Sequence, residues 1–402
     1  MDYKPRYLVM VTASANNNKY YKQIPKSDGT WVAEYGRVGN APQKRVYPME
    51  TWDSKYREKI NKGYTDQTNL IQDLIQAEET GSDYKAIENK VIADIVERLQ
   101  KMARQAISDN YTVSSDKVTQ LMIDEAQNIL TELVDITDTD VFNRKLLTLF
   151  TVIPRKMGNV REHLASANNL ATVIQREQDL LDIMKGQVIQ HTVVDENKKN
   201  KTCNDKTILE QMGLVFEECS DIDIIRIKSL LGSCANQFHN AWKVTNLHTQ
   251  SKFDKFVADN NITNTKLLFH GSRNENWWSI INSGLVLHPT NAVITGKMFG
   301  YGLYYAPKAR KSLGYTSLSG SYWARGTSNS GFMAVMDVAY GKPYDVYSFD
   351  SKFHRFNYEE LQKACPGANC LHAHEGKMLR NDEIIVYKEE QCTIKYLVEL
   401  KN

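Results

Sequence analysis

The chain has 402 residues, 42 % of them hydrophobic and 24 % charged, and its net charge is +2. This length predicts several domains, and the composition is that of globular proteins, which excludes a chain that is disordered as a whole. Six cysteines are too few for a disulfide scaffold, and no apolar run reaches the roughly 18 residues that a membrane span needs. The first residues lack the apolar stretch of a secretory signal, so we expect an intracellular protein with reduced thiols and no membrane partner.

The N-terminal region is more basic than the rest of the chain. Residues 1–66 contain 12 Lys and Arg against 7 Asp and Glu, whereas the remaining residues contain 38 against 41. This asymmetry favours a polyanion as a partner, although an ordinary solvated basic face has the same composition. β-branched and aromatic runs at 7–11 and 31–35, separated by turn-forming residues, predict strands between residues 5 and 50. An amphipathic helix is expected at 52–60.

Residues 84–190 predict a helical bundle. Apolar residues recur there at spacings of three and four, as they do from Ile87 through Ile95 to Met102. The segment 114–116 has the composition of a helix start, and Pro154 is expected to end the third helix. The bundle alone contains no catalytic constellation. The stretch 195–206 is polar and charged apart from Cys203, and it predicts a linker, with bounds at 191–206.

Residues 207–402 mix predicted strands with short helices and contain three groups of residues that suggest chemistry. In the first group, an apolar stretch ends in His270-Gly271-Ser272. An imidazole and a glycine backbone, on which a flat ligand can lie, therefore meet at a strand end. A single histidine in such a place is more often structural.

The second and third groups follow later in the chain. Tyr304-Tyr305-Ala306 precedes Lys311-Ser312 and Tyr315, which suits a slot where a flat ring stacks on tyrosines and a hydroxyl orients it. A tyrosine-rich strand with its turn has the same composition. The third group is Glu383, which opens the apolar run 384–387 and could face either solvent or a cleft.

In this order the three groups resemble the catalytic domain of the poly(ADP-ribose) polymerases, whose His-Tyr-Glu signature matches His270, Tyr304 and Glu383. Residues 79–190 resemble that family's regulatory helical domain, and residues 1–78 resemble its WGR domain. The resemblance implies a multidomain α+β protein with four parts. These are a small β-rich WGR domain at 1–78, an all-α helical bundle at 79–190, a linker at 191–206, and a mixed α/β ADP-ribosyltransferase domain with antiparallel-rich sheets at 207–402.

The resemblance implies that NAD⁺ is a consumed substrate, so that no cofactor is needed. The main chain of Gly271 and the hydroxyl of Ser312 would hold its nicotinamide. Glu383 would bond the nicotinamide ribose, favour the developing cation and polarise the acceptor hydroxyl. Three residues are the predicted catalytic residues: His270, Tyr304 and Glu383.

The other predicted NAD⁺ contacts surround this centre. Tyr304 and Tyr315 would pack on the two faces of the nicotinamide, and His270 would bond the adenosine ribose. The full predicted NAD⁺-binding set is His270, Gly271, Ser272, Tyr304, Tyr305, Ala306, Lys311, Ser312, Tyr315 and Glu383.

The resemblance also implies activation by DNA strand-break ends that carry a 5′-phosphate. Lys19, Arg37 and Lys55 would contact phosphates. Tyr35 stands where the WGR motif has its tryptophan, and it would stack on a nucleotide. The helical domain would restrict access of NAD⁺ until DNA binds, and Asp182 lies in the segment that faces the nucleotide in relatives.

Two further positions bear on the site. Tyr301 stands where the family's polymerases often carry a lysine. Cys365, Cys370, His372 and His374 are spaced closely enough to hold Zn²⁺. Nothing else in that region resembles a zinc fold, so we predict a plain loop and no metal.

Glutamate at position 383 goes with chain elongation in this family, so we expect poly(ADP-ribose) synthesis on the protein itself and on other proteins, in a DNA damage response. The alternatives are a mono-ADP-ribosyltransferase acting on protein or DNA ends, and a DNA-binding scaffold with an inactive transferase domain. The absence of a dinucleotide-binding glycine fingerprint disfavours an NAD-dependent oxidoreductase. We expect a monomer, and the Lys-, Asn- and Ile-rich usage favours a bacterial protein of the cytoplasm or nucleoid over a eukaryotic protein of the nucleus.

Overall fold

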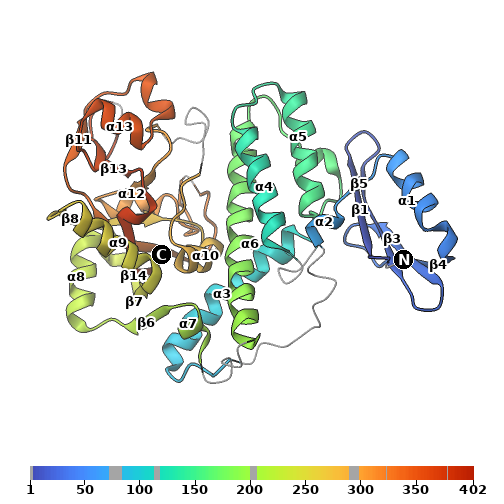
Figure 1. Cartoon of the computed structure of the whole chain (residues 1–402). Coiled ribbons are helices and arrows are strands. Elements are labelled where there is room, and N and C mark those ends of the chain that lie inside the picture. Colours follow the sequence, from blue (N-terminus) through green and yellow to red (C-terminus); the bar gives the residue numbers. More distant parts are fainter. Residues whose placement is uncertain are drawn as a thin grey trace. The chain divides into compact units, whose positions relative to one another are not determined.

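The computed structural model describes residues 3–71, 84–112, 118–199, 206–288, 298–322, 324–377 and 379–402. The chain forms two compact units (Figure 1). Unit 1 contains residues 1–81 and 105–188, and unit 2 contains residues 82–104 and 189–402.

An antiparallel sheet forms the N-terminal part of unit 1. Its strands follow the order β4-β3-β2-β1-β5. The aromatic side chains of Trp31 and Trp52 are almost fully buried against Leu8 and Tyr21, so the helix that begins at Trp52 packs on this sheet. The predicted strands and helix are thereby confirmed. The elements are β1 (Arg6–Thr12), β2 (Asn17–Pro25), β3 (Thr30–Arg37), β4 (Gln43–Pro48), η1 (Met49–Thr51), α1 (Trp52–Asn61), β5 (Thr65–Asp66) and α2 (Thr68–Ile71).

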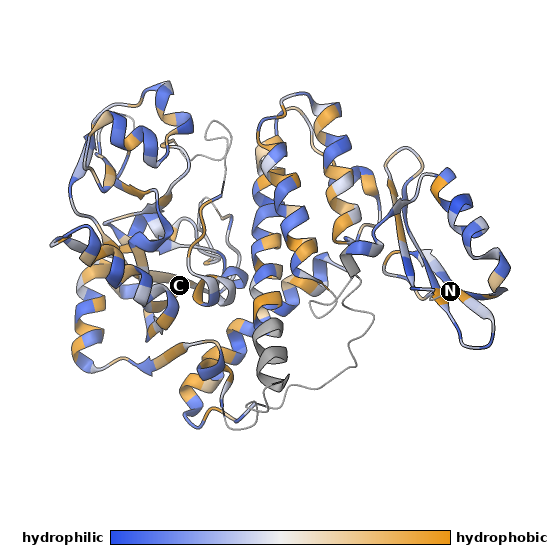
Figure 2. Ribbon diagram, viewed as in Figure 1, coloured by the Kyte–Doolittle hydropathy of each residue, from blue (hydrophilic) through white to orange (hydrophobic). Residues whose placement is uncertain are grey.

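The rest of unit 1 is helical. Hydrophobic and hydrophilic residues alternate along α4 (Gln120–Leu133) and α5 (Thr139–Val152), as the spacing predicts (Figure 2). Thr119 caps α4 by accepting a hydrogen bond from the Met122 amide, and the predicted start at 114–116 lies outside the described residues. α5 ends at Val152, two positions before Pro154, as expected. A short helix η4 (Val160–His163) follows.

Two long helices are divided between the units. α3 (Lys90–Asn110) belongs to unit 2 up to Arg104, and α6 (Leu170–Lys199) belongs to unit 2 from Ile189. Within unit 2, the indole N–H of Trp278 donates to Gln190 of α6 at 2.9 Å. The region predicted as one helical domain at 79–190 therefore contributes to both units.

The predicted linker also differs from the structure. α6 continues to Lys199, so residues 191–199 are helical, and residues 200–205 lie outside the described residues. A polar and charged composition indicates solvent exposure, but it does not distinguish a loop from an exposed helix.

Unit 2 contains two sheets. The larger has the order β6-β7-β14-β10-β8 and is antiparallel throughout. The smaller has the order β11-β12-β13-β9, with parallel pairing only between β11 and β12. The strands of the larger sheet are β6 (Leu214–Glu218), β7 (Phe238–Asn246), β8 (Thr265–Gly271), β10 (Ser330–Ala339) and β14 (Cys392–Lys401). Those of the smaller sheet are β9 (Leu303–Tyr305), β11 (Pro343–Val346), β12 (Cys370–Ala373) and β13 (Glu383–Val386).

Short helices cover these sheets. One apolar core joins Ile227 and Leu231 to the larger sheet, and another joins Phe353 and Leu361 to the smaller one. The mixed α/β class with antiparallel-rich sheets is thus confirmed for this region. Its helices are α7 (Ile208–Gln211), α8 (Asp221–Leu231), η5 (Gly232–Gln237), α9 (Leu247–Asp259), η6 (Asn274–Asn276), α10 (Trp277–Ser283), α12 (Ala309–Leu313), η7 (Ser351–Arg355), α13 (Tyr358–Ala364) and η8 (Glu389–Gln391). Among the described residues, none of the helices has the length and apolar character needed to cross a membrane.

A bidentate ion pair connects α3 to the larger sheet. Arg98 donates from both terminal nitrogens to the Glu399 carboxylate, at 3.2 and 2.7 Å, and Glu399 is only 1 % exposed. The Arg98→Met variant is expected to lose about 2 kcal/mol of unfolding free energy, because it leaves a buried carboxylate without its partner. Urea unfolding monitored by circular dichroism measures this loss. Arg104→Met, which removes an exposed arginine of the same helix, should change the stability little, and equal losses in both variants would contradict the ion-pair argument.

Candidate active site

The candidate site lies where the two sheets of unit 2 meet. β8 is an edge strand of the larger sheet, and β9 is an edge strand of the smaller one. Phe269 and Ala306 join them through two main-chain hydrogen bonds of 2.9 and 3.0 Å. This bridge places His270-Gly271, next after Phe269, beside Tyr304-Tyr305, which immediately precede Ala306. Sequence motifs more than thirty positions apart are therefore neighbours.

Glu383 opens β13, the strand that pairs with β9. Ile384 is in register with Tyr305, so the carboxylate lies next to the bridge between the sheets. Glu383 is 7 % exposed, and its Oε1 forms an ion pair with Lys311 of α12. Its Oε2 is buried and has no hydrogen-bond partner among the described residues. Because a buried polar atom without a partner is costly, this oxygen is suited to accept a hydrogen bond from a ligand.

Gly271 allows two stretches of main chain to approach closely. A Cβ atom built on Gly271 would lie 2.0 Å from the carbonyl oxygen of Ser312, so only glycine fits here. The Ser312 hydroxyl is buried and donates to the Phe269 carbonyl at 3.0 Å. Because its hydrogen is used in this bond, the Ser312 hydroxyl can serve a ligand only as an acceptor. It is therefore suited to accept a hydrogen bond from the N–H group of a carboxamide.

The imidazole of His270 is held in one orientation. Its Nδ1 lies 3.0 Å from the carbonyl oxygen of Tyr304, so Nδ1 carries the hydrogen and Nε2 is the acceptor nitrogen. The rings of Trp277 and Tyr305 lie 6.5 and 6.0 Å from the imidazole. This packing keeps the ring in place at the strand end.

The hydroxyl of Tyr304 is already used inside the protein. It accepts from the Phe299 amide at 3.0 Å and donates to the Gly300 carbonyl at 3.1 Å. Burial raises the pKa of Tyr304, so the phenol stays neutral. The ring of Tyr304 is thus available for packing, while its hydroxyl anchors the segment 299–300.

The remaining predicted NAD⁺ contacts lie around this centre. Tyr305 and Ala306 are buried, and the hydroxyl of Ser272 accepts from Asn276 at 3.0 Å. Tyr315 follows α12 and is 40 % exposed. The structure therefore brings the imidazole, the glycine main chain, the serine hydroxyl and the Lys311–Glu383 pair to one junction, and Tyr315 forms an exposed margin near it.

Comparisons with known proteins assign the chain to a family. A family model described as the poly(ADP-ribose) polymerase catalytic domain matches residues 223–402. The "Putative poly [ADP-ribose] polymerase-like 100L" of Invertebrate iridescent virus 6 is 30 % identical over 169 residues, which cover 41 % of this chain and 87 % of that protein. The chain belongs to the poly(ADP-ribose) polymerase family. Like its family, it is an NAD⁺ ADP-ribosyltransferase.

Two further relatives show how far the similarity extends. "Uncharacterized protein 101L" of the same virus is 30 % identical over 229 residues, covering 56 % of this chain and 93 % of that protein. Chicken Poly [ADP-ribose] polymerase 1 is 24 % identical over 420 residues, covering 97 % of this chain and 38 % of that protein. The similarity to the chicken polymerase therefore includes the N-terminal sheet and the helices, as well as the transferase unit.

The pH dependence of this transferase should follow Lys311. Burial lowers the pKa of Lys311 to about 8, so the amine is charged below this pH and neutral above it. We expect kcat/KM for NAD⁺ to fall as pH rises from 7.5 to 9.5, by up to about tenfold per unit beyond the pKa, because the positive charge beside Glu383 disappears. Initial rates measured across this pH range at low NAD⁺ concentration give this alkaline fall in kcat/KM. Arginine in the Lys311→Arg variant stays charged across the range, so kcat/KM should no longer fall at alkaline pH. If kcat/KM falls as in the wild-type chain, the titrating group is not Lys311.

Sequence reasoning missed two residues that build the site. Asn274 organises the loop after Gly271: its amide side chain donates to the Ser330 carbonyl at 3.0 Å, and its oxygen accepts from the Phe332 amide at 3.3 Å. Trp277 packs its ring on His270 and is fully buried. Their signal in the sequence was the polar and aromatic cluster Asn274–Trp278, directly after the His-Gly-Ser motif.

The predicted DNA contacts lie in unit 1. Lys19 and Arg37 are opposite each other on β2 and β3, and Tyr35 stands two positions before Arg37. Lys19 is exposed, and Lys55 forms an ion pair with Glu58 at 2.8 Å. Asp182 lies on α6 and accepts from Gln178 at 3.0 Å.

Arg37, which we predict to contact a phosphate, also makes contacts within unit 1. Its guanidinium donates to the carbonyls of Asn16, Met157 and Gly158, at 2.8, 3.1 and 2.8 Å. Its Nη2 thus connects the N-terminal sheet to the segment after α5. The basic character of Arg37 was visible in the sequence, but two of these carbonyl acceptors, on Met157 and Gly158, lie about 120 positions away.

The segment of closely spaced cysteines and histidines is not the plain loop that we predicted, because Cys370–Ala373 form the strand β12. Cys370 is fully buried, and burial raises the pKa of its thiol to about 12. A thiol held neutral is a poor zinc ligand, because the thiolate is the binding form. Cys365 packs at the edge of the apolar core of the smaller sheet. His372 and His374 instead lie beside Asp345 of β11.

Proposed function

We propose that this chain is a DNA-break-activated enzyme that builds poly(ADP-ribose) on itself and on other proteins and releases nicotinamide. The observation that carries the proposal is Glu383, a buried carboxylate with one oxygen paired to Lys311 and the other available to a ligand. A growing ADP-ribose chain offers a weakly nucleophilic hydroxyl. A carboxylate that accepts a hydrogen bond from it raises its reactivity.

The reaction breaks the bond between nicotinamide and C1′ of its ribose. This step passes through a cation-like state, as in glycoside hydrolysis. The carboxylate of Glu383 would bond the ribose 2′-hydroxyl and stabilise the developing positive charge. The leaving nicotinamide is neutral, so its position matters more than its protonation.

The pocket residues would provide that position. The main chain of Gly271 and the hydroxyl oxygen of Ser312 would bind the carboxamide, and Tyr304 and Tyr315 would pack against the ring. His270 would bind the adenosine ribose through Nε2. This assignment rests on the fixed orientations of His270 and Ser312 described above.

Residues 1–78 would carry the DNA response as a WGR-like DNA-binding domain, and residues 79–190, which contribute to both units, would be a regulatory helical domain. The similarity to the chicken polymerase over 97 % of this chain supports this reading. Lys19, Lys55 and Tyr35 are the proposed nucleic-acid contacts. Direct hydrogen bonds from the sheet to the helical segments could pass on a change caused by DNA: Asn18 to the Arg155 carbonyl at 3.0 Å, and Gln67 to the Thr151 hydroxyl at 3.0 Å. DNA binding would then shift the helices toward a state that admits NAD⁺.

Product length with labelled NAD⁺ tests the proposal. The full chain is incubated with and without a short duplex that carries a free 5′-phosphate, and the products are separated on a gel. A ladder that forms only with DNA is the expected result. A single band would instead indicate a mono-ADP-ribosyltransferase, and a ladder without DNA would contradict the regulatory role of residues 1–190.

Salt provides a second test of DNA activation. Phosphate contacts release counterions, so the DNA concentration for half-maximal activation should rise steeply with salt, about tenfold or more between 50 and 200 mM. The transferase rate at saturating DNA serves as the control. An unchanged half-maximal concentration would contradict an electrostatic DNA contact.

A further inference from the structure

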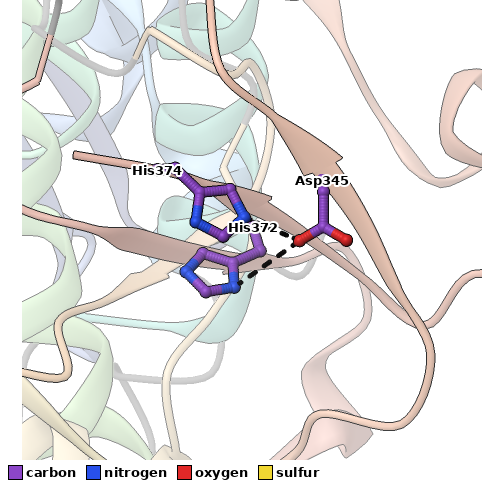
Figure 3. A group of neighbouring side chains, drawn as sticks. All are labelled: Asp345, His372 and His374. Atoms are coloured by element: carbon purple, nitrogen blue, oxygen red, sulfur yellow. Dashed lines mark hydrogen bonds and ion pairs between the residues drawn. The ribbon is translucent and has the colours of Figure 1, made fainter. Parts of the chain in front are cut away.

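Three potential metal ligands come together on the smaller sheet of unit 2, outside the site described above. Asp345 lies on β11, His372 lies on β12, and His374 directly follows β12 (Figure 3). The parallel pairing puts Asp345 in register with His372. The His374 amide continues this pairing by donating to the Val346 carbonyl at 2.9 Å. One ligand atom from each of the three residues lies within 4.8 Å of the others.

The donor set suits a divalent transition metal. Asp345 Oδ1 lies 2.7 Å from His374 Nε2 and 3.9 Å from His372 Nδ1, and both imidazoles point to this carboxylate oxygen (Figure 3). Ligand atoms of tetrahedral Zn²⁺ are about 3.3 Å apart, given Zn–N and Zn–O distances of about 2.0 Å. The observed separations lie on either side of this value. Two nitrogens and one carboxylate oxygen leave a fourth position for water.

A second carboxylate fixes the tautomer of His372. Asp382 Oδ2 lies 3.2 Å from Nε2, and the other oxygen of Asp382 accepts from the Glu375 amide at 2.6 Å. Nε2 therefore carries the hydrogen, and the lone pair of Nδ1 is on the side of Asp345 and His374. A carboxylate that accepts from the outer nitrogen of a histidine is the usual support of a metal-binding imidazole.

The cluster is accessible from solvent. The side chains of Asp345, His374 and His372 are 43 %, 24 % and 12 % exposed. The Tyr340 hydroxyl lies 2.8 Å from Nδ1 of His372 and donates to it, so a cation must displace this one hydrogen bond. An ion must also replace the 2.7 Å hydrogen bond between His374 Nε2 and Asp345 Oδ1.

We propose that Asp345, His372 and His374 form a Zn²⁺ site, with Asp382 as the supporting carboxylate of His372. This departs from the expectation of no metal, and it replaces the cysteines of the sequence grouping with an aspartate from β11. The ion would join β11 to β12. Through its ligand His372, the ion would also hold Asp382, the residue that immediately precedes Glu383.

Metal binding to the full chain tests the site without any transferase assay. The protein is treated with a chelator, dialysed and titrated with Zn²⁺ against a chromophoric competitor, and Co²⁺ replaces Zn²⁺ for visible absorption. We expect one equivalent of Zn²⁺ per chain and the intense d–d bands of tetrahedral Co²⁺. Binding should weaken on acidification, because protons compete for the histidines.

Variants separate this site from adventitious binding. Asp345→Asn and His374→Ala change partly exposed side chains and should each weaken Zn²⁺ binding more than about tenfold, and Asp382→Asn should weaken it about 10- to 100-fold. His239→Gln removes an exposed histidine elsewhere and should have no effect. Circular dichroism confirms that each variant is folded. Absence of stoichiometric binding by the wild-type chain, or equal binding by folded Asp345→Asn and His374→Ala, would overturn the proposal, whatever the product length of the enzyme.

Discussion

Replacing Glu383 with glutamine is expected to abolish chain elongation while NAD⁺ still binds. Glutamine keeps the shape of the side chain but removes the negative charge that, in the proposed mechanism, stabilises the cation-like state and polarises the acceptor hydroxyl. We expect the elongation rate to fall about 10²- to 10³-fold, with products of single ADP-ribose units. The affinity for a non-hydrolysable NAD⁺ analogue should stay within about threefold, because the nicotinamide contacts are unchanged. Gels with labelled NAD⁺ and calorimetry measure the two quantities.

The matched control for this variant is Glu375→Gln. Glu375 is an exposed glutamate in the same region, and its partner Lys308 is also on the surface. This change should leave both product length and analogue affinity unaltered. Long polymers from Glu383→Gln would show that the buried carboxylate is not the group that activates the growing chain.

Gly271→Ala is expected to disable the proposed nicotinamide pocket. Its new methyl group would lie 2.0 Å from the main-chain oxygen of Ser312, so the end of β8 and α12 must move apart. Such a shift misplaces the surfaces that hold the leaving group, and we expect kcat/KM for NAD⁺ to fall at least about 100-fold. Overpacking at a main-chain contact should also lower the unfolding free energy by about 1–3 kcal/mol. Initial rates and urea unfolding give both values.

Gly376→Ala serves as the comparison, because a Cβ atom there meets nothing within 4 Å. Its rate and stability should match those of the wild-type chain. If Gly271→Ala turned over NAD⁺ normally, the close approach to Ser312 would have no bearing on the pocket.

Local features of the structure were predictable from the sequence. β1 and β3 of the N-terminal sheet, α1, and the end of α5 before Pro154 follow from periodicity and turn composition. The candidate site was predictable as a set of residues because its motifs sit at strand ends. The pairing of Lys311 with Glu383 was not, since it depends on the bridge between Phe269 and Ala306 that joins two sheets.

Long-range pairings account for most of what the sequence left open. Arg98 and Glu399 are 301 positions apart, so neither side chain indicates its partner. The Asp345–His372 register requires the parallel pairing of β11 with β12, which nothing in either short strand specifies. Composition likewise did not show that Arg37 is used for contacts within unit 1. In each case the missing information was topology, which local patterns do not contain.

The bridge at Phe269 and Ala306 has a consequence for the thermodynamics of unit 2. His270 and Gly271 belong to one sheet and Glu383 to the other, so a molecule held by all three spans the boundary between two separate apolar cores. Because such a molecule binds only when the two sheets are together, its binding free energy stabilises the association of the sheets. NAD⁺ bound as proposed would therefore couple the unfolding of the two cores, and the transferase unit should melt more cooperatively when occupied than when empty.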